Sequence, residues 1–369
     1  MARVVVVGAG VAGLGVAWAL ACRGHAVRVL DRGEPGRGAS WAAAGMLAPG
    51  AEIGFDELDL YALGRDSLAR WPAFARELEA AAGRPVGYRT EGTLVAADDR
   101  DSARALRRLY RFQREHGVPV EWLTGDEAAE LEPLVSPRIP GAILSPDDHQ
   151  VDNRAVVDAL LAACRAAGVE LAANAPVRAV EAGPLVHLQS GHPVGADAVV
   201  IAAGVGSAGI AGLDPPPPVR PVKGQALALR MTDALRVERV VRGPRAYLVP
   251  KSDGRLVVGA TSEDVGPDTA LTAGGLYRLL EGAVRVVPGV EEMEIVETWV
   301  GLRPASRDHA PILGRARTPG VVYATGHYRH GILLLPATAE LVADEVERVL
   351  SGDAETAAAL APFSPLRFA

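Results

Sequence analysis

The sequence has little of several features that mark particular classes of protein. Only two cysteines occur, Cys22 and Cys164, and both fall in stretches expected to be apolar helices. This favours buried thiols in a reducing compartment over disulfides. No group of histidines and cysteines has metal-ligand spacing, so no metal site is predicted. No stretch holds the roughly 20 apolar residues of a membrane span, and we expect a cytoplasmic protein.

The composition is that of a globular protein large enough for two domains. Of its 369 residues 49% are hydrophobic, so a large core is available. The 41 glycines and 27 prolines stay below the level that indicates disorder. A net charge of −7 argues against a nucleic-acid partner. The apolar run after Arg3 suggests a signal peptide, but glycines interrupt it, so we treat it as part of the mature fold.

The N-terminal 31 residues form the pattern around which the chain is organised. Residues 4–7 read VVVV, as in a buried parallel strand. Residues 11–23 have the alanine and leucine content of a helix, and residues 26–30 read as a second strand. Between the first strand and the helix, three glycines stand at G-x-G-x-x-G spacing: Gly8, Gly10 and Gly13.

This unit predicts a dinucleotide site. The glycines permit a tight turn and let the backbone approach a pyrophosphate at the helix N-terminus. Asp31 follows the second strand, near the spacing of an acid that binds a ribose 2′-hydroxyl. No arginine is placed to take a 2′-phosphate, which favours FAD or NAD over NADP. The alternative is an apolar βαβ unit whose glycines only help packing.

The segment 33–49 departs from an ordinary nicotinamide-binding domain. It reads GEPGRGASWAAAGMLAP, where a further crossover helix and strand would be expected. Its small residues would let backbone amides reach a ligand, so we interpret it as a loop folded against a cofactor, which favours FAD over NAD. The alternative is a flexible linker. Ala202, Ala203 and Gly204 end a later buried strand and would permit a similar close approach.

The remaining elements predict an α/β fold in which a Rossmann-like FAD-binding domain is interleaved with an antiparallel-sheet α+β substrate domain. Helices are predicted at 56–83, 101–116, 152–167 and 276–287, with a last long helix beginning near Gly331. Strands are predicted at 92–96, 141–144, 169–172, 175–181, 185–190, 197–204, 223–230, 246–261, 293–304 and 321–326. The expected FAD-binding domain comprises 1–84, 141–215 and 300–369, and the substrate domain comprises 85–140 and 216–299.

Several motifs, in their order along the chain, resemble one family. They are the glycine-rich unit with Asp31, SWAAAGMLA (40–48), VVIAAG (199–204), RPVKGQ (220–225), YLVPKSDGRLVVGAT (247–261), GLRPASRDHAPILG (301–314) and TGHYRHGILLLPAT (325–338). The chain resembles the FAD-dependent amine and amino-acid oxidoreductases related to D-amino-acid oxidase, and within them the glycine oxidases of thiamine biosynthesis. The resemblance runs nearly end to end.

The resemblance implies FAD bound without a covalent link, since neither cysteine lies in a tethering motif. By position, Val11 and Ala12 would face the pyrophosphate, Asp31 and Arg32 the ribose, and Val177 the adenine side. The residues along the flavin would be Ala39, Ser40, Ala44, Gly45 and Met46, with His327, Tyr328, Arg329, His330, Gly331, Ile332 and Leu333 around the isoalloxazine. A helix starting near Gly331 would place positive partial charge beside the anionic reduced flavin.

The resemblance also implies the residues that contact an amino-acid substrate. Arg303 in GLRP would hold the substrate carboxylate bidentately, and a structural salt bridge is the alternative. Tyr247 would close the pocket and hydrogen-bond the carboxylate, unless it is a plain strand aromatic. Arg329 is a second candidate, and Met46 would line the side-chain region. The partners would be a small amino acid and oxygen, and the family resemblance suggests a homotetramer.

The predicted activity is FAD-dependent oxidative deamination of glycine and other small amines or D-amino acids. Glycine would give glyoxylate, ammonia and hydrogen peroxide, and its imine would supply thiazole synthesis for thiamine. The alternative is a D-amino-acid or sarcosine-type dehydrogenase that passes electrons to an acceptor other than oxygen. A second alternative is a regulatory module that binds a dinucleotide and catalyses no reaction. In such a module Arg303 would have no substrate to bind. Preference among glycine, sarcosine and D-amino acids stays open, as do the roles of Arg245 and His330.

Overall fold

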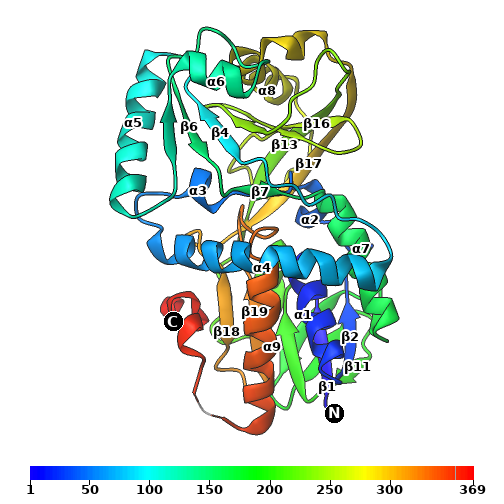
Figure 1. Cartoon of the computed structure of the whole chain (residues 1–369). Coiled ribbons are helices and arrows are strands. Elements are labelled where there is room, and N and C mark those ends of the chain that lie inside the picture. The colour runs from blue at the N-terminus through cyan, green and yellow to red at the C-terminus, as the bar shows by residue number, and fades with distance from the viewer. Residues whose placement is uncertain (354) are drawn as a thin grey trace.

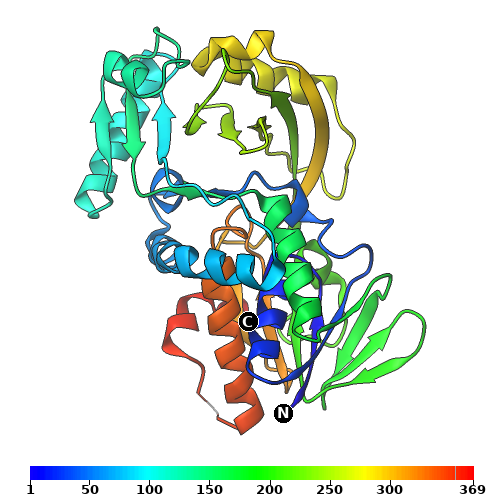
Figure 2. The same cartoon turned by 45° about the vertical axis from the view of Figure 1, so that its right-hand side comes forward.

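The structure is a computed structural model that describes residues 1–353 and 355–369. It has two large sheets, one above the other, with helix α4 (Leu58–Ala82) running across the region between them (Figures 1 and 2). The six-stranded sheet lies in the lower half of Figure 1 and the eight-stranded sheet in the upper half. Both the N-terminal strand and the C-terminal helix belong to the lower half. The chain therefore crosses between the two halves several times.

The six-stranded sheet contains the N-terminal βαβ unit. Its order is β18–β19–β12–β1–β2–β8, and only the edge strand β18 runs antiparallel to its neighbour. The strands are β1 (Arg3–Val7), β2 (Ala26–Leu30), β8 (Glu170–Ala172), β12 (Ala198–Ile201), β18 (Ile312–Arg315) and β19 (Val321–Thr325). This is the predicted doubly covered parallel sheet, whose strands read as continuous apolar runs because both faces are buried.

The valines of β1 show how each face is covered. Val4 and Val6 pack with the helices, and Val5 and Val7 pack on the opposite face, as alternation along a strand requires. The covering helices are α1 (Val11–Cys22), α4, α7 (Asn153–Ala166) and α9 (Leu335–Ser351). The opposite face is covered by a small antiparallel sheet of β9 (Val177–Glu181), β10 (Leu185–Leu188) and β11 (Pro193–Gly195).

The eight-stranded sheet is antiparallel except for one parallel pair, β14 with β4. Its order is β17–β13–β16–β15–β14–β4–β6–β5. The strands are β4 (Thr93–Ala96), β5 (Glu121–Leu123), β6 (Ala142–Ser145), β13 (Arg220–Arg230), β14 (Val240–Arg242), β15 (Tyr247–Pro250), β16 (Arg255–Gly259) and β17 (Ile295–Ala305). Helix α8 (Ala273–Val286) packs on one face, and the other face turns toward the six-stranded sheet.

The remaining elements are short, apart from the amphipathic α5 (Arg100–Glu115), which packs on β4 and β6 of the second sheet, on the face opposite α8. They are α2 (Ala39–Ala42), β3 (Met46–Leu47), α3 (Pro49–Glu52), α6 (Gly125–Leu131), β7 (His149–Gln150) and 3₁₀ turns at Gly204–Gly209, Pro288–Glu292, Ala358–Phe363 and Pro365–Phe368. Within the described residues, no helix combines the length and the apolar character needed to span a membrane.

Three sequence-based expectations need correction. The domain boundaries at 140/141 and 299/300 divide strands from their sheet, because β6 and all of β17 pair in the eight-stranded sheet. We therefore propose boundaries after β6 and after β17. The last helix begins at Leu335 instead of Gly331, after a stretch of turns in which the His327 carbonyl accepts from the His330 N–H and the His330 carbonyl from the Leu334 N–H. Cys22 is exposed, because it is the last residue of α1; Cys164 is buried as expected.

Helix α4 is tied to the turn that precedes α9. The Leu333 carbonyl accepts hydrogen bonds from Ser67 Oγ at 2.7 Å and from Trp71 Nε1 at 2.9 Å. The Ser67 oxygen in turn accepts from the Ala337 N–H in the first turn of α9 at 3.3 Å. Both α4 side chains are fully buried. This arrangement fixes the segment 327–333, on which much of the predicted site depends.

The double variant Ser67→Ala/Trp71→Phe tests this tie. Each single change removes one hydrogen bond to Leu333, and we expect Ser67→Ala to cost about 1 kcal/mol of unfolding free energy. The double variant should lose more than the two single losses together, by about 1–3 kcal/mol, because the buried carbonyl then has no side-chain partner. Chemical denaturation of all four proteins measures the coupling, and additive losses would contradict it.

Candidate functional site

A single long cavity of about 720 Å³ lies between the two sheets. This volume falls within the range of about 300–1,000 Å³ that is typical of small-molecule sites. One end lies at β2 and the small antiparallel sheet, where Asp31 and Val177 line it. The other end lies against the eight-stranded sheet, where Tyr247 and Arg303 line it. The predicted cofactor and substrate positions therefore share one continuous cavity.

The glycine-rich turn after β1 is closed against the neighbouring strand. Gly8 has a φ of +107°, and a β-carbon there would collide with the Ala202 carbonyl at the end of β12. A β-carbon on Gly13 would collide with the Gly8 carbonyl. Glycine at these two positions lets α1 approach the sheet, and Val11 and Ala12 of its first turn line the cavity. Gly13 itself lies behind the lining and serves this packing.

Asp31 is fixed by the backbone at the end of β2. One carboxylate oxygen accepts from the Ala9 N–H at 2.7 Å and the other from the Gly33 N–H at 2.9 Å. An ionised carboxylate has about four acceptor positions, so each oxygen keeps capacity for a ligand hydroxyl. Arg32 lines the same end of the cavity.

These residues fit a dinucleotide cofactor of the FAD type. The turn has no side chains in the path of a pyrophosphate, and no acidic residue occupies the first turn of α1. The Val11 N–H donates to Ser40 Oγ at 3.0 Å, which brings the segment 39–46 to the helix N-terminus. The cavity then continues past Ala44 and Gly45 toward the second sheet, farther than a mononucleotide would need.

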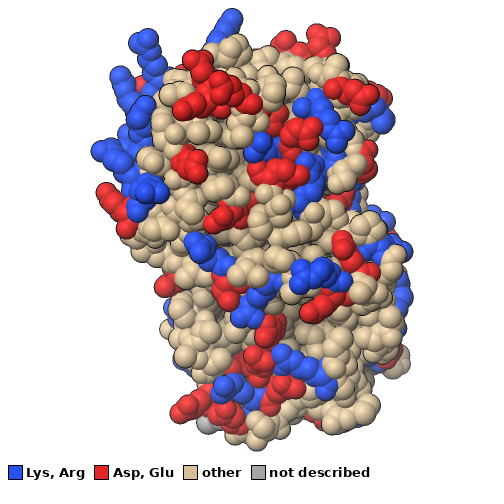
Figure 3. All heavy atoms as spheres, viewed as in Figure 1, with Lys and Arg blue, Asp and Glu red and all other residues tan. Residues whose placement is uncertain are grey.

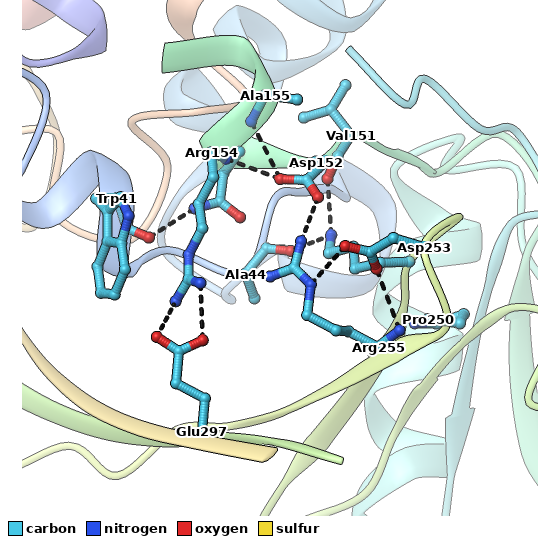
Figure 4. A network of polar contacts seen from close by, with 12 residues as sticks. Trp41, Ala44, Val151, Asp152, Arg154, Ala155, Pro250, Asp253, Arg255 and Glu297 are labelled. Atoms are coloured by element: carbon cyan, nitrogen blue, oxygen red, sulfur yellow. Dashed lines mark hydrogen bonds and ion pairs between the residues drawn. The ribbon is translucent and has the colours of Figure 1, made fainter. Parts of the chain in front are cut away.

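The segment 39–46 is held from both halves of the molecule (Figure 4). The Asn153 side-chain amide, on α7, donates to the Ser40 and Trp41 carbonyls at 3.0 and 2.9 Å. The Trp299 indole, on β17, donates to the Ala42 carbonyl at 3.0 Å. The expected loop against a cofactor is therefore an anchored segment that includes helix α2, and the flexible-linker alternative does not describe it.

An arginine joins the same contacts. The Arg154 guanidinium lies over the Trp41 and Trp299 rings, 3.7 and 4.8 Å from their centroids. It also forms a two-point ion pair with Glu297, at 2.8 and 3.1 Å (Figure 4). Arginine is suited to this position because its flat group stacks and donates in two directions at once.

Lys251 is a buried cation in this network. The residue is 3% exposed, and its amine donates to the Ala44 and Val151 carbonyls at 2.6 and 2.7 Å. Gly45, with a φ of +78°, lies between these partners, and a β-carbon on it would collide with the Val151 carbonyl. Burial lowers the pKa of Lys251 to about 7. The nearby Asp152 opposes this shift while it ion-pairs with Arg255 at 2.6 Å.

At the other end of the cavity, Arg303 has no acidic partner. Its Nη1 donates to the Thr261 carbonyl at 3.0 Å, and no carboxylate in the described part of the chain lies within ion-pair distance. The guanidinium lies over Gly224, where a β-carbon would come within 2.6 Å of it. The structural salt bridge considered as an alternative is therefore not formed. A partly buried cation in a cavity wall is suited to a carboxylate ligand.

Tyr247 stands beside Arg303. Both side chains line the cavity, and burial raises the pKa of the Tyr247 phenol, although the nearby Arg303 charge opposes the shift. The phenol therefore remains protonated at neutral pH and keeps a hydrogen to donate. Its ring lies over Gly259, the cross-strand partner of Tyr247. Tyr247 therefore lines the cavity, whereas the alternative considered a strand aromatic with no such role.

Glycines clear the sheet surface between these two side chains. Gly224 of β13 pairs directly with Gly301 of β17, and both line the cavity together with Gly259. A β-carbon on Gly301 would lie 2.5 Å from that of Ala42. The bare surface admits both the anchored segment 39–46 and a small ligand. Glycine within a strand often marks such a close approach, and this signal was present in the sequence.

Two further predicted residues lie in the cavity wall with partners of their own. Arg329 Nη2 donates to Glu57 at 2.8 Å and to the Glu52 carbonyl at 3.3 Å, so its charge is already matched. Met46 lines the cavity where β3 meets β7. Arg245 also borders the cavity, but its guanidinium pairs with Glu281 on α8 at 3.2 Å.

Residues 327–333, which were predicted to surround the isoalloxazine, line the cavity only in part. His327, Tyr328, Arg329, Gly331 and Ile332 line the cavity, whereas His330 and Leu333 line a small neighbouring hollow. His330 faces Glu52, with Nδ1 3.7 Å from the carboxylate, and burial lowers its pKa to about 4. The later start of α9 accompanies this difference, because the turn before it directs His330 and Leu333 away from the cavity.

The remaining predicted cofactor residues lie in the cavity wall as well: Gly8, Gly10, Ala39, Ser40, Ala44, Gly45 and Gly204. Sequence reasoning missed Lys251, Glu52 and Arg242, which lie in or next to this wall. No local pattern distinguishes them from surface charges, because only the packing of distant segments buries them. Within the described residues, no three His, Cys, Asp or Glu side chains are grouped to hold a metal ion.

The fold and the cavity together define a dinucleotide-binding flavoprotein with a second, ligand-facing sheet. The family model of FAD-dependent oxidoreductases (DAO) matches residues 3–345. The chain belongs to this family of FAD-dependent oxidoreductases.

Several relatives are similar over nearly the whole chain. The glycine oxidase of Geobacillus kaustophilus (strain HTA426) is 39% identical, over 99% of this chain and 96% of that protein. The crystal structure of glycine oxidase from that species superposes with a TM-score of 0.91, covering 99% of this chain and 98% of that one. Iminodiacetate oxidase from Chelativorans sp. BNC1 is 30% identical, with a TM-score of 0.86 over 98% and 99% of the two chains.

A variant of Lys251 tests the anchor of segment 39–46. The folded-state pKa of about 7 lies below the ordinary value of 10.5, so the folded protein binds fewer protons than the unfolded chain between these pH values. Lys251 therefore contributes unfolding free energy that increases as the pH rises from 7 to 10. Compared with Lys251→Met, the wild type should gain up to a few kcal/mol over this range, as measured by chemical denaturation. A difference that does not change with pH would contradict the buried-amine assignment.

Proposed function

We propose that this protein oxidises glycine and other small amino acids with FAD, releasing the imine that hydrolyses to a 2-oxo acid (glyoxylate from glycine) and ammonia. The observation that carries the proposal is Arg303, a cation without a carboxylate partner in the described residues, in the same cavity as the dinucleotide turn. Relatives named glycine oxidase that cover nearly the whole chain support the same activity.

The residues of the chain define how a substrate would sit. Arg303 would hold the carboxylate through two parallel hydrogen bonds, and the Tyr247 phenol would donate a third. The cleared surface over Gly224, Gly259 and Gly301 leaves room for the ligand's Cα above the sheet. Met46 would limit the space for a side chain, which favours glycine and other small substrates. When bound, FAD supplies the acceptor for the Cα hydride.

The proposed cofactor contacts follow the cavity wall. Asp31 and Arg32 would face the ribose, and Val11 and Ala12 the pyrophosphate. Ser40, Ala44 and Gly45 would lie along the flavin, with the segment 327–332 on its other side. No side chain need act as a strong base, because the amine can lose its proton before the hydride moves.

We further propose a role in making the thiazole of thiamine. The bifunctional protein ThiO/ThiG of Trichormus variabilis (strain ATCC 29413 / PCC 7937) is 37% identical over 92% of this chain. The chain covers 52% of that relative, so it spans about half of its length. A homotetramer and a cytoplasmic location are also proposals that rest on family resemblance. Light scattering of the purified protein tests the tetramer.

Oxygen consumption tests the proposed activity. Purified yellow protein with glycine should consume oxygen and release ammonia and hydrogen peroxide in equal amounts. Sarcosine, D-alanine and iminodiacetate serve as comparison substrates that rank the pocket by size and charge. Flavin reduction without oxygen consumption would favour a dehydrogenase with another acceptor. Protein that stays oxidised with every amino acid in the panel would contradict the proposed function.

Substitution of Arg303 tests carboxylate binding. Arg303→Ala should retain FAD, because the residue lies on β17 of the second sheet and away from the dinucleotide turn. Truncating one partner of a desolvated charge pair costs roughly 2–5 kcal/mol, so kcat/KM for glycine should fall about 30-fold or more. Arg303→Lys should recover little, because a point charge does not reproduce the two-pronged contact.

An amine that lacks a carboxylate is the control for this variant. Its oxidation should change much less, because it never used the contact. Equal losses for both substrates with unchanged flavin content would show that Arg303 is not the carboxylate anchor, and Arg329 would be tested next.

A further inference from the structure

Glu52 is a buried acid in the wall of the substrate end of the cavity. It is the last residue of helix α3, and its side chain is 9% exposed. Asp148 fixes this short helix by accepting from the Gly50 and Ala51 N–H groups, each at 2.9 Å. The Gln113 amide donates to the Gly50 carbonyl at 3.0 Å. The backbone of the helix that carries Glu52 is therefore held by contacts from two distant parts of the chain.

Two arginines and a histidine surround this carboxylate. Arg242 Nη1 on β14 lies 2.7 Å from one oxygen, and His330 Nδ1 lies 3.7 Å from the other. Burial alone would raise the pKa of Glu52, but the charge and hydrogen bond of Arg242, together with the charge of Arg329, outweigh it and lower the pKa below its ordinary value. Glu52 is therefore ionised at neutral pH. Only one of its oxygens is held by a short ion pair, which leaves acceptor capacity on the other.

The charge of Glu52 is distinctive within the cavity. Three acidic residues line it among those described, and two of them, Asp31 and Glu34, follow β2 at the dinucleotide end. Glu52 alone stands at the end that holds Tyr247 and Arg303, close enough to Tyr247 for its charge to help raise that pKa. The substrate end therefore presents an unpaired cation and a buried anion to the same space.

We propose that Glu52 binds the amino group of the substrate while Arg303 holds the carboxylate. This assignment rests on the proposed function, because it concerns an amino acid in this cavity. A zwitterion placed with its carboxylate on Arg303 needs an anionic partner for its ammonium, and unpaired burial of that charge would be costly. Glu52 is the acid that the structure provides there. Its pairing with Arg242 keeps it ionised when no substrate is bound.

The proposal has a consequence for the order of proton and hydride transfer. The bound ammonium would release one proton to solvent, and the neutral amine would then give up its Cα hydrogen with both bonding electrons to the acceptor that bound FAD supplies. The resulting iminium ion again carries positive charge beside Glu52. A carboxylate next to an amine favours the protonated form and raises the pKa of that amine. Glu52 should thus tighten binding and move the onset of hydride transfer to higher pH.

Other titrating groups near Glu52 need separate attention. Arg242 faces it from β14, Arg329 and His330 from the turn before α9, and Tyr247 from β15. Asp148 lies behind it, and burial raises the pKa of Asp148 to about 7. The comparison must therefore be made between variants over the whole pH range, because a single wild-type profile mixes these groups.

The test uses the holoenzyme of the wild type and of Glu52→Gln. Glycine binding and flavin reduction are measured anaerobically by stopped flow from about pH 6 to about pH 11, a range that covers the titration of the substrate amine. Glycolate, which has a hydroxyl in place of the amine, is titrated by its effect on the flavin spectrum. We expect Glu52→Gln to weaken glycine about tenfold or more, to leave glycolate within about twofold, and to lower the pH midpoint of reduction by about one unit.

Two further variants separate binding from structure. Glu52→Asp keeps the negative charge on α3 and should keep the pH midpoint of reduction, even though its shorter side chain weakens glycine binding. If Glu52→Gln loses FAD, Glu52→Asp takes its place in the comparison of glycine with glycolate. Glu57→Gln removes the acid that pairs with Arg329 and should leave the midpoint unchanged. Equal weakening of glycine and glycolate with an unshifted midpoint would overturn the role of Glu52. Wild-type flavin that no amino acid reduces would instead defeat the proposed function.

Discussion

The two halves of the site depend on the anchoring of segment 39–46. This stretch receives hydrogen bonds from α7 through Asn153, from β17 through Trp299 and from the β15–β16 hairpin through Lys251. It also provides Ser40 to the first turn of α1. One segment thus joins the dinucleotide turn to the ligand-facing sheet. The small side chains of segment 39–46 leave the cavity open. The buried Lys251 fixes the backbone of this segment through the Ala44 carbonyl.

Charged side chains lie at both ends of the cavity. The dinucleotide end combines its glycines with Asp31, Arg32, Glu34 and Arg37, whereas the substrate end gathers Arg242, Arg303, Arg329 and Glu52. On the face that Figure 3 shows, acidic and basic side chains are mixed, with arginines of α5 gathered at the upper left. No residue of α5 lines the cavity, in keeping with a solvated helix face for these arginines.

Much of the fold was predictable because its signals are local. The VVVV run, the spaced glycines and the amphipathic helices specify their elements, and the family motifs place Arg303 and Tyr247 in one site. The misplaced elements lack such signals. Helix α9 starts four residues after Gly331 because tertiary contacts from α4 hold Leu333 in the preceding turn. Glu52 and Lys251 become buried only when distant segments pack around them, which no periodicity reveals.

The central claim is that one cavity binds FAD beside segment 39–46 and holds the substrate carboxylate on Arg303. A crystal structure of the holoenzyme with bound glycolate tests it most directly. The account predicts the glycolate carboxylate on Arg303 and Tyr247, with its neighbouring carbon against the flavin ring above Gly224 and Gly301. A carboxylate bound to Arg242 or Arg329, or a ligand separated from the ring by protein side chains, would contradict it.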